Sequence, residues 1–351
     1  MIDLRSDTVT KPTAEMMSAI AQAELGDDVW EDDPTVNRLQ DLAAEKLGME
    51  AALLVPSGTM GNLIAVLVHC PRGTELIVGD QAHIFRWEGG NVSMVGGIHP
   101  YTLPNQPDGT LAIADIQSAI RFEDVHLPRT SAIALENTHN NCGGVAIEPS
   151  YFAAVRQIAD QHELKVHLDG ARLFNAAAAL NRSVQDFTQY ADSVMVCLSK
   201  GLCAPVGSML VGSGPFIAQA RKVRKLLGGG MRQVGIIAAA GIVALEQMVD
   251  RLAEDHAHAD RLAAGLNAVP GIQVQDKMFS GEVVTTNMVY FTLADDHPIS
   301  PQELAGKLEA EYQILLDAGA SRDFRLVTHY WVSTADIETT ITGFQEILSC
   351  V

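Results

Sequence analysis

A carboxylate and an amine each follow a short apolar run near the middle of the chain. The run 165–168 ends at Asp169, and Lys200 follows the run 193–198 by two residues. Strand-like and helix-like segments alternate here, which favours a mostly parallel sheet. The carboxyl ends of such strands open onto one ligand-binding crevice. We therefore expect Asp169 and Lys200 to reach the same crevice.

An acid and a lysine in one crevice are the groups that pyridoxal phosphate requires. The lysine forms a Schiff base, and the acid keeps the ring nitrogen protonated so that the ring can accept electrons. Each residue alone has an ordinary alternative, because Asp169 before Gly170 is common in turns and Ser-Lys-Gly is a frequent polar exit from a strand. The occurrence of both residues, each after a strand-like run, favours the cofactor site.

A phosphate site is predicted nearer the start of the chain. Residues 51–55 are an expected strand, 56–58 a turn and 59–70 an apolar helix. The free N–H groups and the positive dipole end of such a helix attract phosphate, although an ordinary strand-to-helix connection has the same pattern. The turn lacks the lysine of nucleotide-binding phosphate loops, and Pro215 breaks a dinucleotide-like glycine pattern at 212–214. Both points disfavour nucleotide cofactors.

Among the other reactive residues, His83 follows a strand-like run and can act in the crevice or lie on the surface. The acidic stretch 26–33 is interpreted as the approach to a helix that Asp33 caps, with proline next, and not as a metal site. His256 and His258 are two residues apart and face different sides of a helix, which argues against a metal pair. No metal is expected.

The composition and charge narrow the class of protein. The 351 residues are 47% hydrophobic and 19% charged, which is typical of a globular protein with room for a large and a small domain. The net charge of -19 opposes binding to nucleic acid or anionic membranes. The longest uncharged apolar run, 235–245, is too short to cross a bilayer, and no signal pattern begins the chain, so we expect a cytoplasmic protein. The 5 scattered cysteines indicate reduced thiols.

The periodicity predicts an N-terminal arm (1–20), a large α/β domain (21–245) and a small C-terminal α+β domain (246–351). Strands are expected at 51–55, 75–80, 131–137, 165–168, 193–198, 206–212, 272–274, 287–293 and 324–329. Helices are expected at 13–23, 59–70, 114–120, 151–162, 217–226, 236–264, 301–312 and 335–348. The region 89–107 is interpreted as loop with short strands.

With these parts in order, the chain resembles the L-threonine aldolase family of the low-specificity type. That family has the aspartate-aminotransferase-like fold (fold type I) of pyridoxal-phosphate enzymes. The resemblance extends over nearly the whole length. Its motifs are Leu-Arg-Ser-Asp-Thr-Val-Thr (4–10), Gly-Asp-Asp-Val (26–29), Asp-Asp-Pro-Thr-Val (32–36), Glu-Asn-Thr-His-Asn (136–140), Asp-Gly-Ala-Arg (169–172), Cys-Leu-Ser-Lys-Gly-Leu (197–202), Pro-Val-Gly-Ser (205–208), Gly-Gly-Gly-Met-Arg-Gln (228–233) and Arg-Leu-Val-Thr-His (325–329).

The resemblance implies how pyridoxal phosphate is held. Lys200 would form the Schiff base, Asp169 would contact the ring nitrogen, and His83 would stack on the ring. Arg172 is also counted among the residues around the cofactor. The phosphate would be held by Ser57, Gly58 and Thr59, joined by Arg232 and Lys225 of a neighbouring subunit.

The resemblance also implies the reaction, in which L-threonine or L-allo-threonine is cleaved to glycine and acetaldehyde. The substrate carboxylate would be bound by Ser6, Arg172 and Arg325, since guanidinium groups match carboxylates well. The base for the β-hydroxyl proton is left open between His83, His126 and a water that they hold. A homotetramer with shared sites is expected, with a dimer as the alternative.

Two alternative functions are left open, and the sequence departs from the family pattern at a few positions. The chain could be another pyridoxal-phosphate enzyme of this fold, a β-eliminating lyase or an aminotransferase, or a non-catalytic protein that keeps the fold. Trp30 and Glu31 replace the tyrosine and small residue expected before the Asp-Asp-Pro run, and Gln81 and Trp87 flank His83. If these line the pocket, they affect the side-chain preference and the choice between threonine and allo-threonine.

Overall fold

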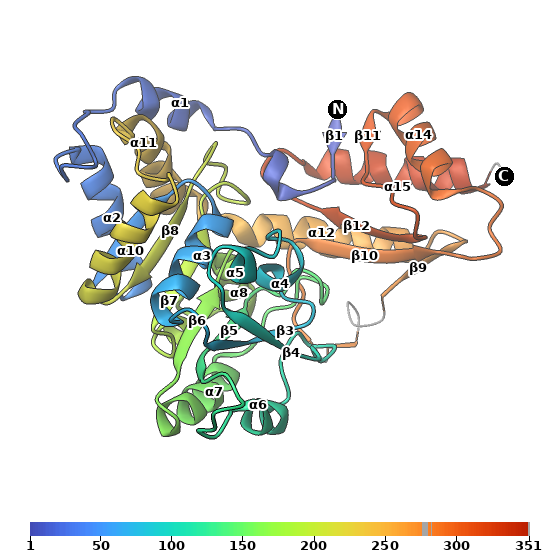
Figure 1. Cartoon of the computed structure of the whole chain (residues 1–351). Helices are drawn as coiled ribbons and strands as arrows, with labels where there is room; N and C mark the ends of the chain where they lie inside the picture. Colours follow the sequence, from blue (N-terminus) through green and yellow to red (C-terminus); the bar gives the residue numbers. More distant parts are fainter. Residues whose placement is uncertain (276–279, 282, 350–351) are drawn as a thin grey trace.

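The structure, a computed structural model, describes residues 1–275, 280–281 and 283–349 (Figure 1). Its larger part is built on a 7-stranded sheet in the order β2-β8-β7-β6-β5-β3-β4. The strands are β2 (Ala51–Val55), β3 (Glu75–Gly79), β4 (His99–Leu103), β5 (Thr130–Glu136), β6 (Lys165–Asp169), β7 (Ser193–Cys197) and β8 (Ser208–Gly212). All are parallel except β8, which runs antiparallel to both of its neighbours. The prediction of a mostly parallel α/β sheet is confirmed.

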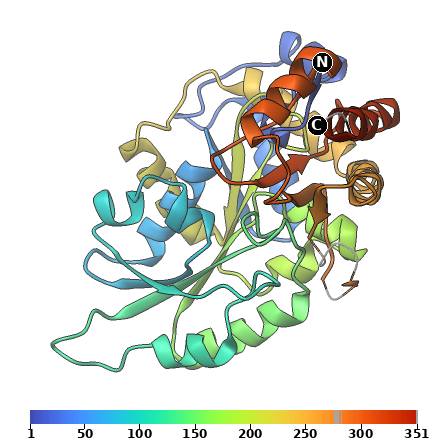
Figure 2. The same ribbon diagram turned by 90° about the vertical axis from the view of Figure 1, so that its right-hand side faces the viewer.

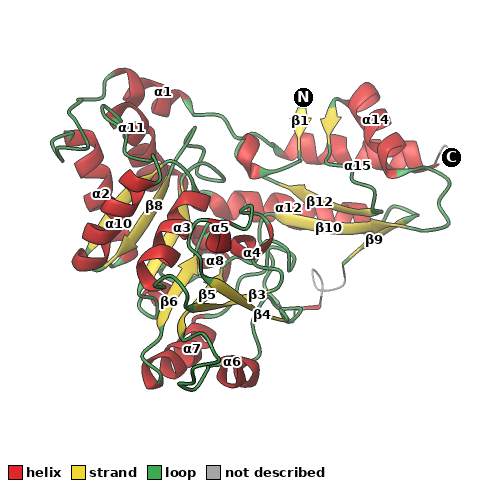
Figure 3. Cartoon of the chain, in the orientation of Figure 1, coloured by secondary structure: helices red, strands yellow, loops and turns green. Residues whose placement is uncertain are grey.

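Helices cover both faces of this sheet (Figure 3). Successive residues of one strand lie in different hydrophobic clusters, as Leu53 and Leu54 of β2 do. Burial on both faces explains why these strands are continuous apolar runs. The helices of this part are α2 (Pro34–Leu47), α3 (Gly58–His69), α4 (His83–Arg86), α5 (Asn91–Met94), α6 (Ile113–Ala119), α7 (Pro149–Gln161), α8 (Leu173–Leu180), α9 (Gln185–Thr188), α10 (Gly214–Leu226) and α11 (Gly235–Val243).

Two helix starts show how local sequence sets the boundaries. The Asp33 carboxylate accepts the N–H groups of Thr35 and Val36, so the predicted cap of α2 is confirmed. Helix α10 begins three residues earlier than expected, because the Ser213 hydroxyl accepts the N–H of Phe216 and proline occupies the first turn. The small residues before α10 are therefore a helix cap.

The second part of the chain has its own sheet and hydrophobic core. Its 3 antiparallel strands lie in the order β12-β10-β9, namely β12 (Asp323–Val327), β10 (Met288–Leu293) and β9 (Ile272–Val274). Helices α12 (Leu252–Asn267), α14 (Pro301–Tyr312) and α15 (Thr334–Ser349) pack with this sheet. The expected single helix 236–264 is divided by a π-helical turn at Ala244–Met248, after which α12 enters the second core.

The amino-terminal segment connects the two cores. Strand β1 (Ile2–Asp3) pairs in parallel with β11 (Ile314–Leu315), and Ile2 and Leu4 are buried in the second core. The blue segment lies beside the orange and red elements in both views (Figures 1 and 2). Helix α1 (Ala14–Ala21) then packs against α11 of the larger part. The division of the chain near residues 20 and 245 stays a proposal.

Among the described residues, no helix combines the length and the apolar character needed to span a bilayer.

Candidate functional site

Asp169 and Lys200 line one cavity at the carboxyl ends of the parallel strands. Asp169 is the last residue of β6, and Lys200 lies three residues beyond the end of β7. The cavity has a volume of about 360 Å³, and His83 lines it as well. The structure thus brings together the acid, the amine and the imidazole that the sequence singled out. We call this space the cofactor cavity.

Both oxygens of the Asp169 carboxylate have a fixed partner. Oδ1 accepts the backbone N–H of Ala171 at 3.1 Å, and Oδ2 accepts the Asn62 amide at 2.8 Å. The side chain is almost fully buried. The acid is therefore held in one orientation at the base of the cavity. Sequence reasoning missed Asn62 because it lies within an ordinary apolar helix.

The start of α3 forms another part of the cofactor cavity. The Ser57 hydroxyl caps the helix by accepting the N–H of Met60, and Ser57, Gly58 and Thr59 all line the cavity. A Cβ at Gly58 would lie 3.0 Å from the Cys197 sulfur, so the helix start packs closely on the strand behind it. A 12-residue helix with its amino end at a cavity is suited to a phosphate group.

Arg232 and Lys225 do not reach this phosphate end within their own chain. The Arg232 side chain is exposed and pairs with Asp27 at 2.9 Å. Lys225 lines a separate groove between α2 and α10. Neither residue lines the cofactor cavity.

His83 is fixed at both its backbone and its ring. Its N–H donates to Glu136 Oε2 at 2.7 Å, and its Nδ1 lies 2.9 Å from Glu88 Oε1. Burial would lower the pKa of His83, but the Glu88 hydrogen bond and the nearby carboxylates, Asp169 among them, raise it above the ordinary value. Burial raises the pKa of Glu88, and the charge of Asp169 raises it further.

The donor atoms of His83, Glu88 and Asp169 lie within 4.8 Å of one another, a distance compatible with a metal ion. The amide of Asn62 donates to both carboxylates, and Glu88 also binds the His83 ring. These hydrogen bonds account for the closeness of the three groups.

A second cavity, of about 600 Å³, adjoins the first. Thr8, His83 and Lys200 line both, so the amine lies where the two spaces meet. We call the second space the substrate cavity. Its remaining lining includes the three predicted carboxylate ligands, Ser6, Arg172 and Arg325. The structure brings these together from the amino-terminal segment, the start of α8 and strand β12.

Arg172 already binds a carboxylate of its own chain. Its Nε and Nη2 donate to Asp7 at 2.7 and 2.6 Å, and both side chains are buried. Burial alone would raise the pKa of Asp7, but the Arg172 guanidinium holds it far below its usual range. Asp7 therefore balances the charge of Arg172 and leaves only the remaining guanidinium N–H groups for a ligand.

Arg325 is the less neutralised of the two arginines. Its Nη1 donates to Asn140 Oδ1 at 2.8 Å, and its Nη2 to the backbone oxygen of Arg5 at 3.2 Å. The Tyr290 hydroxyl donates to the backbone oxygen of Asn140 at 2.6 Å. These neutral partners orient the guanidinium without cancelling its charge.

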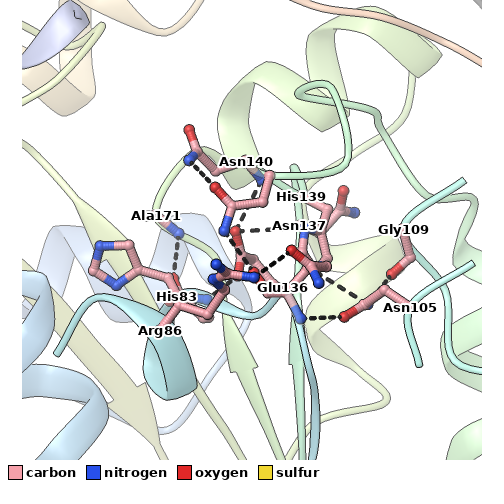
Figure 4. Close-up of polar contacts among 12 residues, drawn as sticks. His83, Arg86, Asn105, Gly109, Glu136, Asn137, His139, Asn140 and Ala171 are labelled. Carbon is pink, nitrogen blue, oxygen red and sulfur yellow. Dashed lines mark hydrogen bonds and ion pairs between the residues drawn. The ribbon is translucent and has the colours of Figure 1, made fainter. Parts of the chain in front are cut away.

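Glu136 connects the loops that carry these groups (Figure 4). While its Oε2 accepts the N–H of His83, its Oε1 accepts the N–H of Asn140 at 2.9 Å. One buried carboxylate at the end of β5 thus holds both the start of α4 and the loop that orients Arg325. In the sequence, Glu136 and Asn140 stood out only as the two ends of a motif (136–140) of the family resemblance, with no role assigned to either.

His126 is not brought into either cavity. It lies in the connection between α6 and β5, with its Nδ1 2.8 Å from Asp124 and its side chain 85% exposed. This connection enters β5 at its amino end, opposite the crevice. Of the departures noted in the sequence, Trp87 lines the substrate cavity, whereas Trp30 is exposed and lines neither cavity.

Comparison with known proteins agrees with this geometry. The beta-eliminating lyase family model matches residues 3–294. A probable low-specificity L-threonine aldolase of Arabidopsis thaliana is 48% identical, with 99% of this chain and 97% of that protein aligned. The low specificity L-threonine aldolase of Escherichia coli K12 is 42% identical, with 99% and 100% aligned. The structure of a Leishmania major threonine aldolase has a TM-score of 0.81 at 18% identity, covering 99% and 100% of the two chains.

The fold is therefore that of the fold type I pyridoxal-phosphate enzymes. The chain belongs to the beta-eliminating lyase family and, within it, to the low-specificity L-threonine aldolases, as the resemblance predicted.

Proposed function

We propose that this chain uses pyridoxal phosphate to cleave L-threonine, L-allo-threonine and related β-hydroxy-α-amino acids into glycine and an aldehyde. The supporting observation is the pair of adjoining cavities that meet at Lys200. One cavity has the groups that the cofactor needs, and the other has guanidinium groups for an amino-acid carboxylate. The family membership supports the same reaction.

The residues of the cofactor cavity fit the coenzyme. The buried Asp169 carboxylate suits its ring nitrogen, the Lys200 amine suits covalent attachment, and the capped start of α3 suits its phosphate. When bound, the coenzyme accepts the electrons of the Cα–Cβ bond that breaks.

In the substrate cavity, Arg325 binds the amino-acid carboxylate, and Arg172 adds its remaining N–H groups. Both arginines are oriented before the substrate arrives, by Asn140 and Asp7 respectively. This reduces the conformational entropy lost on binding. Holding the carboxylate on one side turns the rest of the amino acid towards His83 and Lys200.

Within this chain, His83 can accept the proton of the β-hydroxyl, directly or through a water. Its Nδ1 is occupied by Glu88, so its Nε2 is the nitrogen left for the substrate. Help of this kind is typically worth about 10²–10⁴-fold in rate. The alternative is His126 of a neighbouring subunit, because His126 is exposed in its own chain.

Acetaldehyde formation tests the reaction. Purified protein with the coenzyme should release acetaldehyde from L-threonine or L-allo-threonine, and Lys200→Ala should abolish release. Lys307→Ala, a lysine of α14 outside both cavities, is the matched control. Release of ammonia and an oxo acid instead would favour a β-eliminating enzyme and refute the proposal.

A homotetramer with shared sites is part of the proposal. The cofactor cavity lacks Arg232 and Lys225 from its own chain, and apolar side chains near them are exposed, including Leu226 (79%) and Ile236 (44%). Mixing inactive Arg232→Ala and Lys200→Ala proteins should then restore some activity, since a hybrid contains one site with both residues intact. No recovery after exchange of subunits would contradict a site that combines Lys200 of one subunit with Arg232 of another.

The proposed location is the cytoplasm. The thiols of Cys70, Cys197 and Cys203 are buried and not in disulfides, which suits a reducing compartment.

A further inference from the structure

A chain of hydrogen bonds runs from Asp169 through the interior to the far end of α3. Asn62 donates to Asp169, and Asn62 Oδ1 lies 3.0 Å from His167 Nε2. The Nδ1 of His167 lies 2.8 Å from the Ser193 hydroxyl, which lies 2.7 Å from His69 Nε2. Asn62, His167 and Ser193 are fully buried.

The direction of this chain follows from its chemistry. The Asn62 nitrogen lies between Asp169 Oδ2 and Glu88 Oε1, at 2.8 and 2.9 Å. A carboxylate oxygen accepts, so the NH₂ group must face these two oxygens and the amide oxygen must face His167. The Nε2 of His167 must then carry a hydrogen.

The remaining links are fixed in turn. Burial lowers the pKa of His167 to about 4, so its ring carries only one hydrogen near neutral pH. With that hydrogen on Nε2, Nδ1 is an acceptor and the Ser193 hydroxyl must donate to it. Ser193 then accepts from His69 Nε2. Every link has one donor and one acceptor.

We propose that Asn62, His167 and Ser193 are positioning residues that hold the Asp169 carboxylate in the orientation that meets the cofactor ring. This inference rests on the proposed role of Asp169. The amide cannot rotate without turning its oxygen towards two carboxylates, and His167 holds that oxygen in place. Because Asn62 also binds Glu88, the same chain aligns His83 with Asp169.

A purely structural role explains these residues less well. They lie on β6, β7 and α3 among valine, leucine and isoleucine side chains of the core. Buried polar side chains contribute little net stability even when hydrogen-bonded, and apolar residues of similar size often serve as well. The need to orient Asp169 explains why three polar residues, hydrogen-bonded to one another, lead to that acid through the core.

The proton positions provide the first test. Neutron diffraction from crystals of the wild-type protein should place the hydrogen of His167 on Nε2 and direct the Ser193 hydroxyl towards Nδ1. A hydrogen on Nδ1 instead would contradict the proposed order of donors and acceptors from Asn62 to His69. This readout needs neither activity nor bound coenzyme, so it is independent of the proposed reaction.

Binding of pyridoxal phosphate to the cofactor-free protein provides the second test. Ser193→Ala removes the hydroxyl that pairs with both His167 and His69 and should raise the dissociation constant about three- to tenfold. Asn62→Asp places a third carboxylate beside Asp169 and Glu88 and should raise it by more than about tenfold. Ser131→Ala replaces a buried serine of β5 that takes no part in these hydrogen bonds, and its dissociation constant should equal that of the wild type.

The comparison of the two serine variants separates positioning from general loss of stability. Equal dissociation constants for Ser193→Ala and Ser131→Ala would overturn the positioning role. If Ser193→Ala does not fold, Asn62→Asp decides the question, and a dissociation constant equal to that of the wild type would overturn the positioning role. Failure of the wild type to bind the coenzyme would refute the proposed function, which the hydrogen positions do not test.

Discussion

Replacing Asp7 with asparagine should destabilise the protein far more than the same change at Asp3. Each aspartate binds the Nε and Nη2 of one arginine, Asp7 at 2.7 and 2.6 Å from Arg172 and Asp3 at 2.9 and 2.6 Å from Arg5. The side chain of Arg172 is 6% exposed, whereas that of Arg5 is 48% exposed. The two pairs share their geometry and differ in burial.

Burial sets the expected magnitude. Removing one partner of a buried ion pair leaves the other charge without compensation and costs about 3–5 kcal/mol. Asparagine keeps one acceptor oxygen for Arg172, so we expect a loss near the lower end, about 3 kcal/mol. An exposed pair contributes about 0–1 kcal/mol, which is the expected limit for Asp3→Asn.

The pH dependence has a definite sign. The pKa of Asp7 is lowered in the folded protein, and an unfolded aspartate titrates near about 3.9. A lowered folded pKa means that the stabilisation is fully present above the unfolded pKa and is lost as the pH falls towards the folded value. The difference between the wild type and Asp7→Asn should therefore shrink below about pH 4.

Urea unfolding of the cofactor-free protein, followed by tryptophan fluorescence, measures these differences. Asp3→Asn is the matched control, because it makes the same chemical change in the same segment. If both variants lower the unfolding free energy by the same amount, burial does not determine the contribution of the Asp7–Arg172 pair. The reasoning would then be wrong.

Three further predictions concern the cavities. Arg325→Lys should raise the KM for threonine by about tenfold or more, since lysine cannot make the planar fork contact, while the absorbance of bound coenzyme stays unchanged. Glu88→Gln removes a negative charge that raises the pKa of His83, so an NMR titration of the cofactor-free protein should show a lower pKa; an unchanged pKa would exclude Glu88 as a cause. His126→Asn should lower kcat/KM for aldol cleavage less than His83→Asn, because only His83 lines its own chain's cavities, and the reverse order would indicate that His126 serves a neighbouring subunit.

The strands of the large sheet were predictable because each is an apolar run that ends in polar residues. The runs at 165–168 and 193–198 correspond closely to β6 and β7. Very short elements were not predictable. Helix α4 has 4 residues and begins at an N–H that binds Glu136, far along the chain. Strand β1 has 2 residues and pairs with β11, so nothing local indicates it.

The site residues also differ in whether a local sequence signal predicted their positions. Asp169 and Lys200 lie at or just after strand ends, and the ends of parallel strands meet at one edge, so their convergence was expected. For His83 the sequence left open whether it acts in the crevice or lies on the surface, and the structure places it in the cavity wall. The family resemblance assigned Arg172 to a substrate carboxylate, a role that suits its guanidinium group. The chain itself supplies a carboxylate there, Asp7, and no pattern linked residues 165 positions apart. His126 precedes a strand, and that position points away from the crevice.

The two cavities differ in how they are assembled. Apart from Thr8, the lining of the cofactor cavity comes from residues 56–206, within the part built on the large sheet. The substrate cavity needs Arg172 from that part, Ser6 from the amino-terminal segment and Arg325 from the second sheet. Asp7 ties this segment to Arg172, and it also accepts the amide of Asn287 at 3.4 Å. Docking of one short segment thus completes the amino-acid side, while the coenzyme side is almost complete without it.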